Sequence, residues 1–173
     1  MRKMIDLALA HVSQWHGDGR TYAFIDSISL QLSEEQATVI ELAYWDYCGW
    51  HLQERFPETA MEAQKANRNR CEVMDKFDEW YETRLKPPSS DRFPAPSMIP
   101  NTETMGSLLD RIINHKIKLR HLRQDTPKMT KDGNTIAVEL DWLIRATIQL
   151  DEDCVAGRRY VFPFSRFKVG YPT

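Results

Sequence analysis

The chain has 173 residues, of which 42% are hydrophobic and 28% charged, and its formal net charge is −2. This length and composition indicate one globular domain over residues 1–173. The charge balance excludes the strongly basic surface typical of double-stranded nucleic acid binding, and no apolar run has the length of a membrane span or a signal peptide. The three cysteines are far apart and form no C-x-x-C pair, which argues against a disulfide framework. We therefore expect a cytoplasmic protein.

The N-terminal region contains one clear helix. Apolar residues recur at helical spacing over residues 4–15 and predict a helix there. The glycines of His16-Gly-Asp-Gly-Arg20 interrupt the pattern. Segment 21–32 fits either a helix or a strand, and we assign it to a helix.

Two long helices follow with almost no loop between them. Ser33-Glu-Glu-Gln36 forms a capping box that opens a helix over about 33–56. Pro57 suits the first turn of the next helix, over about 58–85. Consecutive long helices with a minimal connection predict an antiparallel hairpin.

The second half of the chain begins with five prolines within residues 86–104, which exclude a helix and leave a long connection of a kind that is often functional. Helices are predicted over about 104–124 and 134–155, with Gly157 as the cap of the last one. Residues 158–173 are basic and aromatic and should be extended. The fold class is therefore all-α, a bundle built on the hairpin.

The helix over 104–124 carries polar residues in an unusual place. Asp110, Asn114, Lys118 and His121 lie at i, i+4, i+8 and i+11 and share one stripe. Apolar residues surround this stripe, so the helix should be buried and its polar groups should be paired. We expect Asp110, Lys118 and His121 to meet Arg70 in one polar cluster. It is either a structural network or the lining of a pocket.

The segment Asn101–Ser107 places a polar turn at the start of that helix. Unpaired N–H groups and the helix dipole favour an anion at such a position. Glu103 would accept hydrogen bonds from hydroxyl groups, which suggests a sugar phosphate or a nucleotide. The alternative is ordinary capping by Thr102 or Thr104.

Other polar residues lie on apolar helix faces. Asn67 and Arg70 fall within the apolar stripe of the 58–85 helix, and the guanidinium needs either Asp110 or Asp78 or an anionic ligand. His51 and Glu54 share a face next to Trp50, as either a helix end or part of a metal site. No full ligand set can be assembled from the sequence, so we expect no dependence on a metal.

Two further patterns leave alternatives open. Glu72-Val-Met-Asp75 has the carboxylate spacing of helical nucleotide pyrophosphohydrolases, but the second carboxylate pair of those enzymes is missing from the preceding helix. The tail contains Arg158, Arg159, Arg166 and Lys168 between aromatic residues. It either binds single-stranded nucleic acid, or covers the core with one or two arginines reaching a phosphate, or is purely structural.

Four segments resemble the signature of a bacterial family known as domain of unknown function 4254, in order and rough spacing over residues 40–170. The segments are Asn101-Thr-Glu-Thr-x-Gly-Ser-x-x-Asp-Arg with Lys118 and His121, Trp50-His51-x-x-Glu54, Asn67-x-x-Arg70, and Ala156-Gly-Arg-Arg-Tyr with Arg166-Phe-Lys-Val. The resemblance implies an all-helical domain. Members are often encoded near sugar-transfer and surface-polysaccharide enzymes, which implies a sugar-linked or nucleotide-linked ligand but no known activity or cofactor.

Two hypotheses for function follow. In the first, a pocket binds a phosphorylated, hydroxyl-rich small molecule, and His121, or alternatively His51, acts as acid or base with Asp110 and Glu103. The expected ligand-binding residues are Asn101, Thr102, Arg70, Asn67, Arg111, Lys118, His51, Trp50 and Arg166. In the second, the same polar residues form a structural network in a non-catalytic interaction module. Its partner is a protein bound at loop 86–100 or a second copy of this chain.

Overall fold

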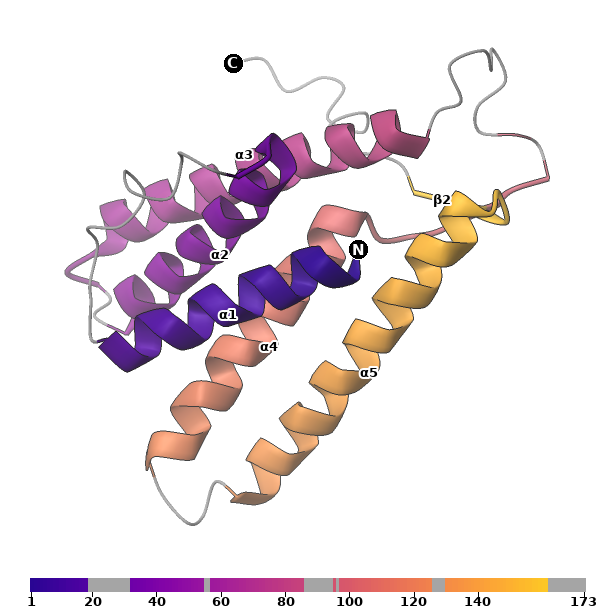
Figure 1. The fold of residues 1–173 in the computed structure, drawn as a ribbon. Coiled ribbons are helices and arrows are strands. Elements are labelled where there is room, and N and C mark those ends of the chain that lie inside the picture. The colour runs from indigo at the N-terminus through magenta and orange to yellow at the C-terminus, as the bar shows by residue number, and fades with distance from the viewer. Residues whose placement is uncertain (19–31, 55–56, 86–94, 96, 126–129, 162–173) are drawn as a thin grey trace.

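The computed structural model describes residues 1–18, 32–54, 57–85, 95, 97–125 and 130–161. Helices dominate this part of the chain, which confirms the all-α prediction (Figure 1). None of the described helices is long and apolar enough to cross a membrane. The elements are α1 (Arg2–Asp18), α2 (Glu34–Gln53), α3 (Ala60–Leu85), β1 (Ile99–Pro100), α4 (Met105–Asp125), α5 (Thr130–Val155) and β2 (Arg159–Tyr160).

Helix α4 lies at the centre of the bundle and contacts α1, α2, α3 and α5. Leu109, Ile112, Ile113 and Ile117 on this helix are all 0% exposed. Each such side chain stabilises the fold by about 1.5–3 kcal/mol relative to full exposure. The sequence prediction that this helix is buried is confirmed, and the other helices present one apolar face to it.

Helices α2 and α3 pack along each other, as the predicted hairpin requires (Figure 1). The capping box opens α2, where the backbone N–H of Ser33 donates to Gln36 Oε1 at 3.0 Å. Helix α3 begins two residues later than expected, because residues 57–59 form a turn in which the Pro57 carbonyl accepts from Ala60 N–H. Segment 21–32 falls almost wholly outside the described residues.

The end of α5 is tied to the chain that leads into α4. Gly157 has φ +70°, and its N–H donates to the Cys154 carbonyl, which confirms it as the cap of α5. The two strands then pair in parallel, with Ile99 N–H donating to the Arg158 carbonyl at 3.0 Å. Helix α5 begins four residues earlier than predicted. The tail beyond residue 161 lies outside the described residues.

The start of α4 sits tightly against α3. The backbone N–H of Gly106 donates to the buried Asp78 carboxylate at 2.6 Å. A Cβ atom on Gly106 would lie 2.9 Å from the Met74 carbonyl oxygen and 3.1 Å from Asp78 Oδ1. Only glycine lets the two helices approach this closely, so the Gly of the N-T-E-T-x-G segment has a packing role.

We expect Gly106→Ala to destabilise the fold by about 1–3 kcal/mol, the usual range for overpacking a tight contact. Chemical denaturation followed by circular dichroism measures the change. Gly133→Ala on α5 is the matched control, because a Cβ there meets nothing within 4 Å. That control should leave stability unchanged or raise it by up to about 1 kcal/mol. Equal effects of the two substitutions would contradict the close approach of α4 to α3.

Candidate functional site

Three helices bring polar side chains together beside α4. Asp46 on α2, Asn67 and Arg70 on α3, and Asp110 and Asn114 on α4 form a group that we call the Arg70 cluster. Arg70 NH1 lies 3.6 Å from Asp46 Oδ1 and 3.3 Å from Asp110 Oδ1. Arg70 NH2 donates to Asn67 Oδ1 at 2.9 Å, and Asn114 Nδ2 donates to Asp46 Oδ1 at 3.2 Å. The sequence offered Asp110 as a partner of Arg70, whereas Asp46 was not foreseen.

The two carboxyl groups of the cluster face one guanidinium. Burial raises the pKa of Asp46 well above its usual range, and the charge of Asp110 and a hydrogen bond to its carboxylate raise it further. Burial also raises the pKa of Asp110, although Arg70 opposes that shift. Asp46 Oδ2 and Asp110 Oδ1 are buried and accept no hydrogen bond, although Asp110 Oδ1 lies 3.3 Å from Arg70 NH1. A proton held by Asp46 and donated to Asp110 removes both defects and leaves the cluster electrically neutral.

A small hollow opens at the cluster, between α2, α3 and α4. Its lining includes Trp50, Gln53, Asn67, Arg70 and Asn114, and its volume is about 50 Å³. Ligand pockets for drug-sized molecules usually have about 300–1,000 Å³, while one water needs roughly 10–15 Å³ by this measure. The hollow therefore accepts a few waters or one polar group of a ligand, but not a whole nucleotide.

Three histidines meet farther along α4. His16 on α1, His51 on α2 and His121 on α4 form a group that we call the histidine cluster. Each offers a ring nitrogen, and these atoms all lie within 4.8 Å of one another. Burial lowers the pKa of His16, and the neighbouring His121 and His51 lower it further, while the Val12 carbonyl opposes the shift. This environment favours neutral imidazole at His16.

Glu54 and Trp50 support the histidine cluster. His51 Nδ1 lies 3.2 Å from Glu54 Oε2, and His121 Nδ1 lies 3.5 Å from Glu54 Oε1. Trp50 donates from Nε1 to the same carboxylate at 3.1 Å and stacks on His121 with 5.4 Å between ring centres. Because Trp50 also lines the hollow, it connects the histidine cluster to the Arg70 cluster. His16 was not predicted as a site residue, because it stands beside a Gly-rich break in the sequence and is 105 residues from His121.

At the start of α4, protein side chains already accept two of the N–H groups that a ligand anion was expected to bind. Thr104 Oγ1 accepts the N–H of Ser107 at 3.1 Å, and Asp78 accepts the N–H of Gly106. The capping alternative therefore holds, with Thr104 as the cap. Asn101 Nδ2 donates to the Glu103 carbonyl, and Thr102 is exposed.

Other predicted site residues lie apart from the Arg70 cluster. Glu103 and Arg111 form an ion pair at 2.7 Å with side chains 38% and 47% exposed. Neither has a hydrogen bond or an ion pair with the Arg70 cluster in the part of the chain that the structure describes. Lys118 is exposed and has no hydrogen bond or ion pair with the Arg70 cluster among the described residues. Arg166 and most of loop 86–100 fall among the residues that are not described.

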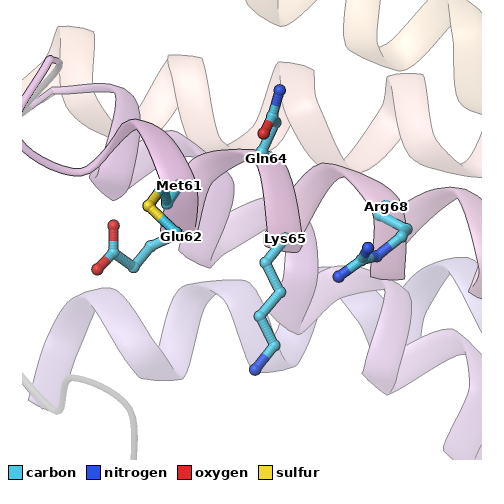
Figure 2. A pocket seen from close by; sticks show the side chains of 5 residues that line it. All are labelled: Met61, Glu62, Gln64, Lys65 and Arg68. Carbon is cyan, nitrogen blue, oxygen red and sulfur yellow. The ribbon is translucent and has the colours of Figure 1, made fainter.

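A larger hollow of about 580 Å³ lies along the outer face of α3, at Met61, Glu62, Gln64, Lys65 and Arg68 (Figure 2). All these side chains come from one helix. Gln64 points away from Lys65, and the polar ends do not converge on a common point (Figure 2). This surface lacks the convergent polar groups of a binding site.

A protein-family model described as "Protein of unknown function (DUF4254)" matches residues 52–161. The chain belongs to this family. The match confirms the family that the sequence motifs indicated, and it includes Glu54, Arg70, Asn114 and His121. The search of curated proteins found no match, and neither did the search of solved structures. The family description assigns no activity.

The shared proton predicts a distinctive pH dependence for Asp46→Asn. Because the pKa of Asp46 is raised in the folded chain, the unfolded chain releases this proton first as pH rises above about 3.9. Stability of the unaltered chain then falls by up to about 1.4 kcal/mol per pH unit until the folded group also ionises. Asparagine cannot ionise, and its NH₂ group replaces the O–H donor. Asp46→Asn should therefore gain stability relative to the unaltered chain as pH rises from about 4 to 7.

Urea denaturation at several pH values checks this prediction. Asp132→Asn, at an exposed position on α5, is the control and should show a difference from the unaltered chain that varies little with pH. A large loss of stability in Asp46→Asn that grows with pH would mean that Asp46 is ionised in the cluster.

Proposed function

We propose that the chain binds a hydroxyl-rich, phosphorylated small molecule, such as a sugar phosphate or a nucleotide sugar, across the mouth of the hollow beside the Arg70 cluster. The observation that supports this most is a set of buried polar atoms that line an opening to the surface. The Arg70 side chain is 30% exposed while its Nε atom is buried without a hydrogen-bond partner. Such groups are stabilised when a ligand supplies the missing partners.

The neutral charge of the cluster favours hydroxyl groups over a phosphate inside the hollow. Arg70 is already neutralised by the Asp46–Asp110 pair, which together carries one negative charge when it shares a proton. Carboxyl, amide and guanidinium groups can all hydrogen-bond to sugar hydroxyls. The edge of one sugar ring therefore fits the hollow, and the indole of Trp50 at the rim offers an apolar surface for a ring.

The phosphate of the proposed ligand would lie outside the hollow, on Lys118. This lysine shares the polar stripe of α4 with Asn114 and His121 and is exposed. In the described part of the chain it forms no ion pair, so its ammonium group is available to an anion. The resemblance to a family encoded near sugar-transfer enzymes agrees with this class of ligand.

Two groups along α4 could move protons if the chain also acts on its ligand. The raised pKa of Asp46 favours one proton shared by the Asp46–Asp110 pair, and His121 is half-buried and stacks on Trp50, which lines the hollow. Glu103 has no part in this proposed proton transfer, because its carboxylate accepts a hydrogen bond from Arg111. His51 supports the rim through its contact with Glu54. The cytoplasmic location expected from the sequence remains part of this proposal.

A thermal-shift panel of sugar phosphates, nucleotide sugars and nucleotides tests the proposal. A ligand at one hundred times its Kd should stabilise the fold by about 2.7 kcal/mol. Lys118→Ala should weaken binding of the phosphorylated ligand about tenfold or more and leave stability within about 1 kcal/mol, because this exposed lysine has no described ion pair to lose. Lys3→Ala, at an exposed lysine of α1, is the control and should bind normally.

Two outcomes would contradict this proposal. In one, no member of the panel shifts the melting temperature. In the other, Lys118→Ala binds the ligand as tightly as the unaltered chain. The interaction-module alternative would then take its place. Its first residues to change would be Val138 and Trp142, which lie one turn apart on α5 and are 70% and 71% exposed.

A further inference from the structure

We propose that His16, His51 and His121 bind one divalent transition-metal ion, Zn²⁺ in the simplest case, through their Nε2 atoms. The inference rests on the geometry of the histidine cluster and does not require the proposed ligand, but a bound ion would occupy His121 Nε2 and exclude this ring from proton transfer. It replaces the sequence expectation of a metal-independent chain, which held that no full ligand set could be assembled. Three of the five histidines of the chain meet at this point, each from a different helix.

The spacing of the rings fits a tetrahedral ion. Two nitrogens bound to Zn²⁺ at 2.0–2.1 Å lie about 3.4 Å apart, and the centres of their rings lie about 5.2 Å apart. His16 Nε2 and His121 Nε2 are separated by 3.4 Å. The ring centres are 5.1 Å apart for His16 and His121, 5.3 Å for His51 and His121, and 6.0 Å for His16 and His51. Small ring rotations would bring all three nitrogens within bonding distance.

The Nδ1 atoms already face hydrogen-bond acceptors. His16 Nδ1 lies 2.9 Å from the Val12 carbonyl oxygen, so it must carry the hydrogen of that contact. His51 and His121 direct Nδ1 toward the two oxygens of Glu54. These contacts favour the tautomer of each neutral ring that carries its hydrogen on Nδ1, which leaves the lone pair on Nε2.

The arrangement of these lone pairs is unfavourable without a cation. With both Nδ1 atoms protonated, the Nε2 atoms of His16 and His121, 3.4 Å apart, would each present a lone pair and would repel each other. His51 Nε2 is buried and has no hydrogen-bond partner. One positive ion between the three Nε2 atoms would remove the repulsion between His16 and His121. It would also give the buried His51 nitrogen a partner.

Glu54 supplies the outer support that metal-binding histidines usually have. Histidine ligands commonly donate their second N–H to a carboxylate or a backbone carbonyl, which fixes the ring and raises its basicity. Here Glu54 serves two rings and the Val12 carbonyl serves the third. Trp50 holds the carboxylate through Nε1, so Glu54 is itself fixed in place.

The ligand set indicates the class of ion. Three imidazoles without thiolate suit zinc, copper, iron or nickel, and not magnesium or calcium, which prefer oxygen ligands. No fourth histidine, cysteine or carboxylate joins the cluster in the described residues. Three protein ligands and one open position are typical of zinc sites that bind a water or a substrate.

A proton is the competing explanation for the cluster. An imidazolium at one ring would donate from Nε2 to its neighbour and would also remove the repulsion. The two explanations differ in a measurable way, because only the metal site binds a stoichiometric ion.

The experiment is a titration of the metal-stripped full chain with Zn²⁺ against a chromophoric chelator, together with the absorption spectrum of the Co²⁺ form. We expect one equivalent of Zn²⁺ per chain and the intense visible bands of four-coordinate Co²⁺. His16→Ala, His51→Ala and His121→Ala should each weaken binding at least 100-fold. Glu54→Gln should weaken it about 10–100-fold, the usual effect of removing outer support.

Matched histidines on the same helices are the controls. His11→Ala on α1 and His115→Ala on α4 should leave Zn²⁺ affinity unchanged, because neither belongs to the cluster. Circular dichroism shows which variants fold. If a variant does not fold, the Co²⁺ spectrum of the unaltered chain still tests the site, because it needs no substitution. Absence of the tetrahedral Co²⁺ bands would overturn the proposal, as would Zn²⁺ binding that is equally tight in the cluster variants and the controls.

Discussion

The structure depends on a buried helix that carries polar side chains. Helix α4 contacts all the other described helices, so most of its surface is removed from water. Each buried polar group on it must find a protein partner, since an unpaired buried group costs about 1–3 kcal/mol. Asp78 meets its first turn, Arg70 and Asp46 meet its middle, and the histidine cluster gathers near its end. The neighbouring helices are therefore positioned by hydrogen bonds as well as by apolar packing.

The distribution of charge within the Arg70 cluster follows from the same constraint. Two ionised carboxylates around a single guanidinium would leave one excess charge inside the bundle. Burial favours the neutral form of a carboxyl group, and one shared proton balances the set. A balanced cluster that also borders an opening to solvent combines a stable scaffold with polar atoms that a ligand can reach.

Much of the fold could be predicted because its signals are local. Apolar periodicity located the helices, the capping box opened α2 and Gly157 closed α5. Two helix starts shifted by two to four residues: the turn at residues 57–59 delays α3, and α5 begins at Thr130 instead of residue 134. The polar stripe on α4 was visible from spacing alone, and Asp110 was correctly offered as a partner of Arg70.

The contents of the two clusters were harder to predict, because they depend on which distant helices meet. Asp46 sits within an apolar run of α2, and its only sequence signal is a single carboxylate in a row of buried residues. His16 lies in the last turn of α1, and the docking of this helix onto α2 and α4 cannot be predicted from apolar periodicity. Lys118 shares the stripe of Asp110 but is exposed. Helical spacing predicts which face a side chain lies on, but not how far along the helix the neighbouring helices cover that face.

The origin of the histidine cluster in three separate helices has a consequence for folding. His16 and His121 are 105 residues apart, so the site exists only after α1 has docked on α2 and α4. Hydrophobic contacts of Ile5, Ala8 and Val12 hold α1 in that place. A transient opening in which α1 alone detaches would dismantle the cluster while the α2–α3 and α4–α5 pairs persist. Occupancy of the cluster would therefore oppose this one local opening more than any other, and amide hydrogen exchange in α1 would slow first.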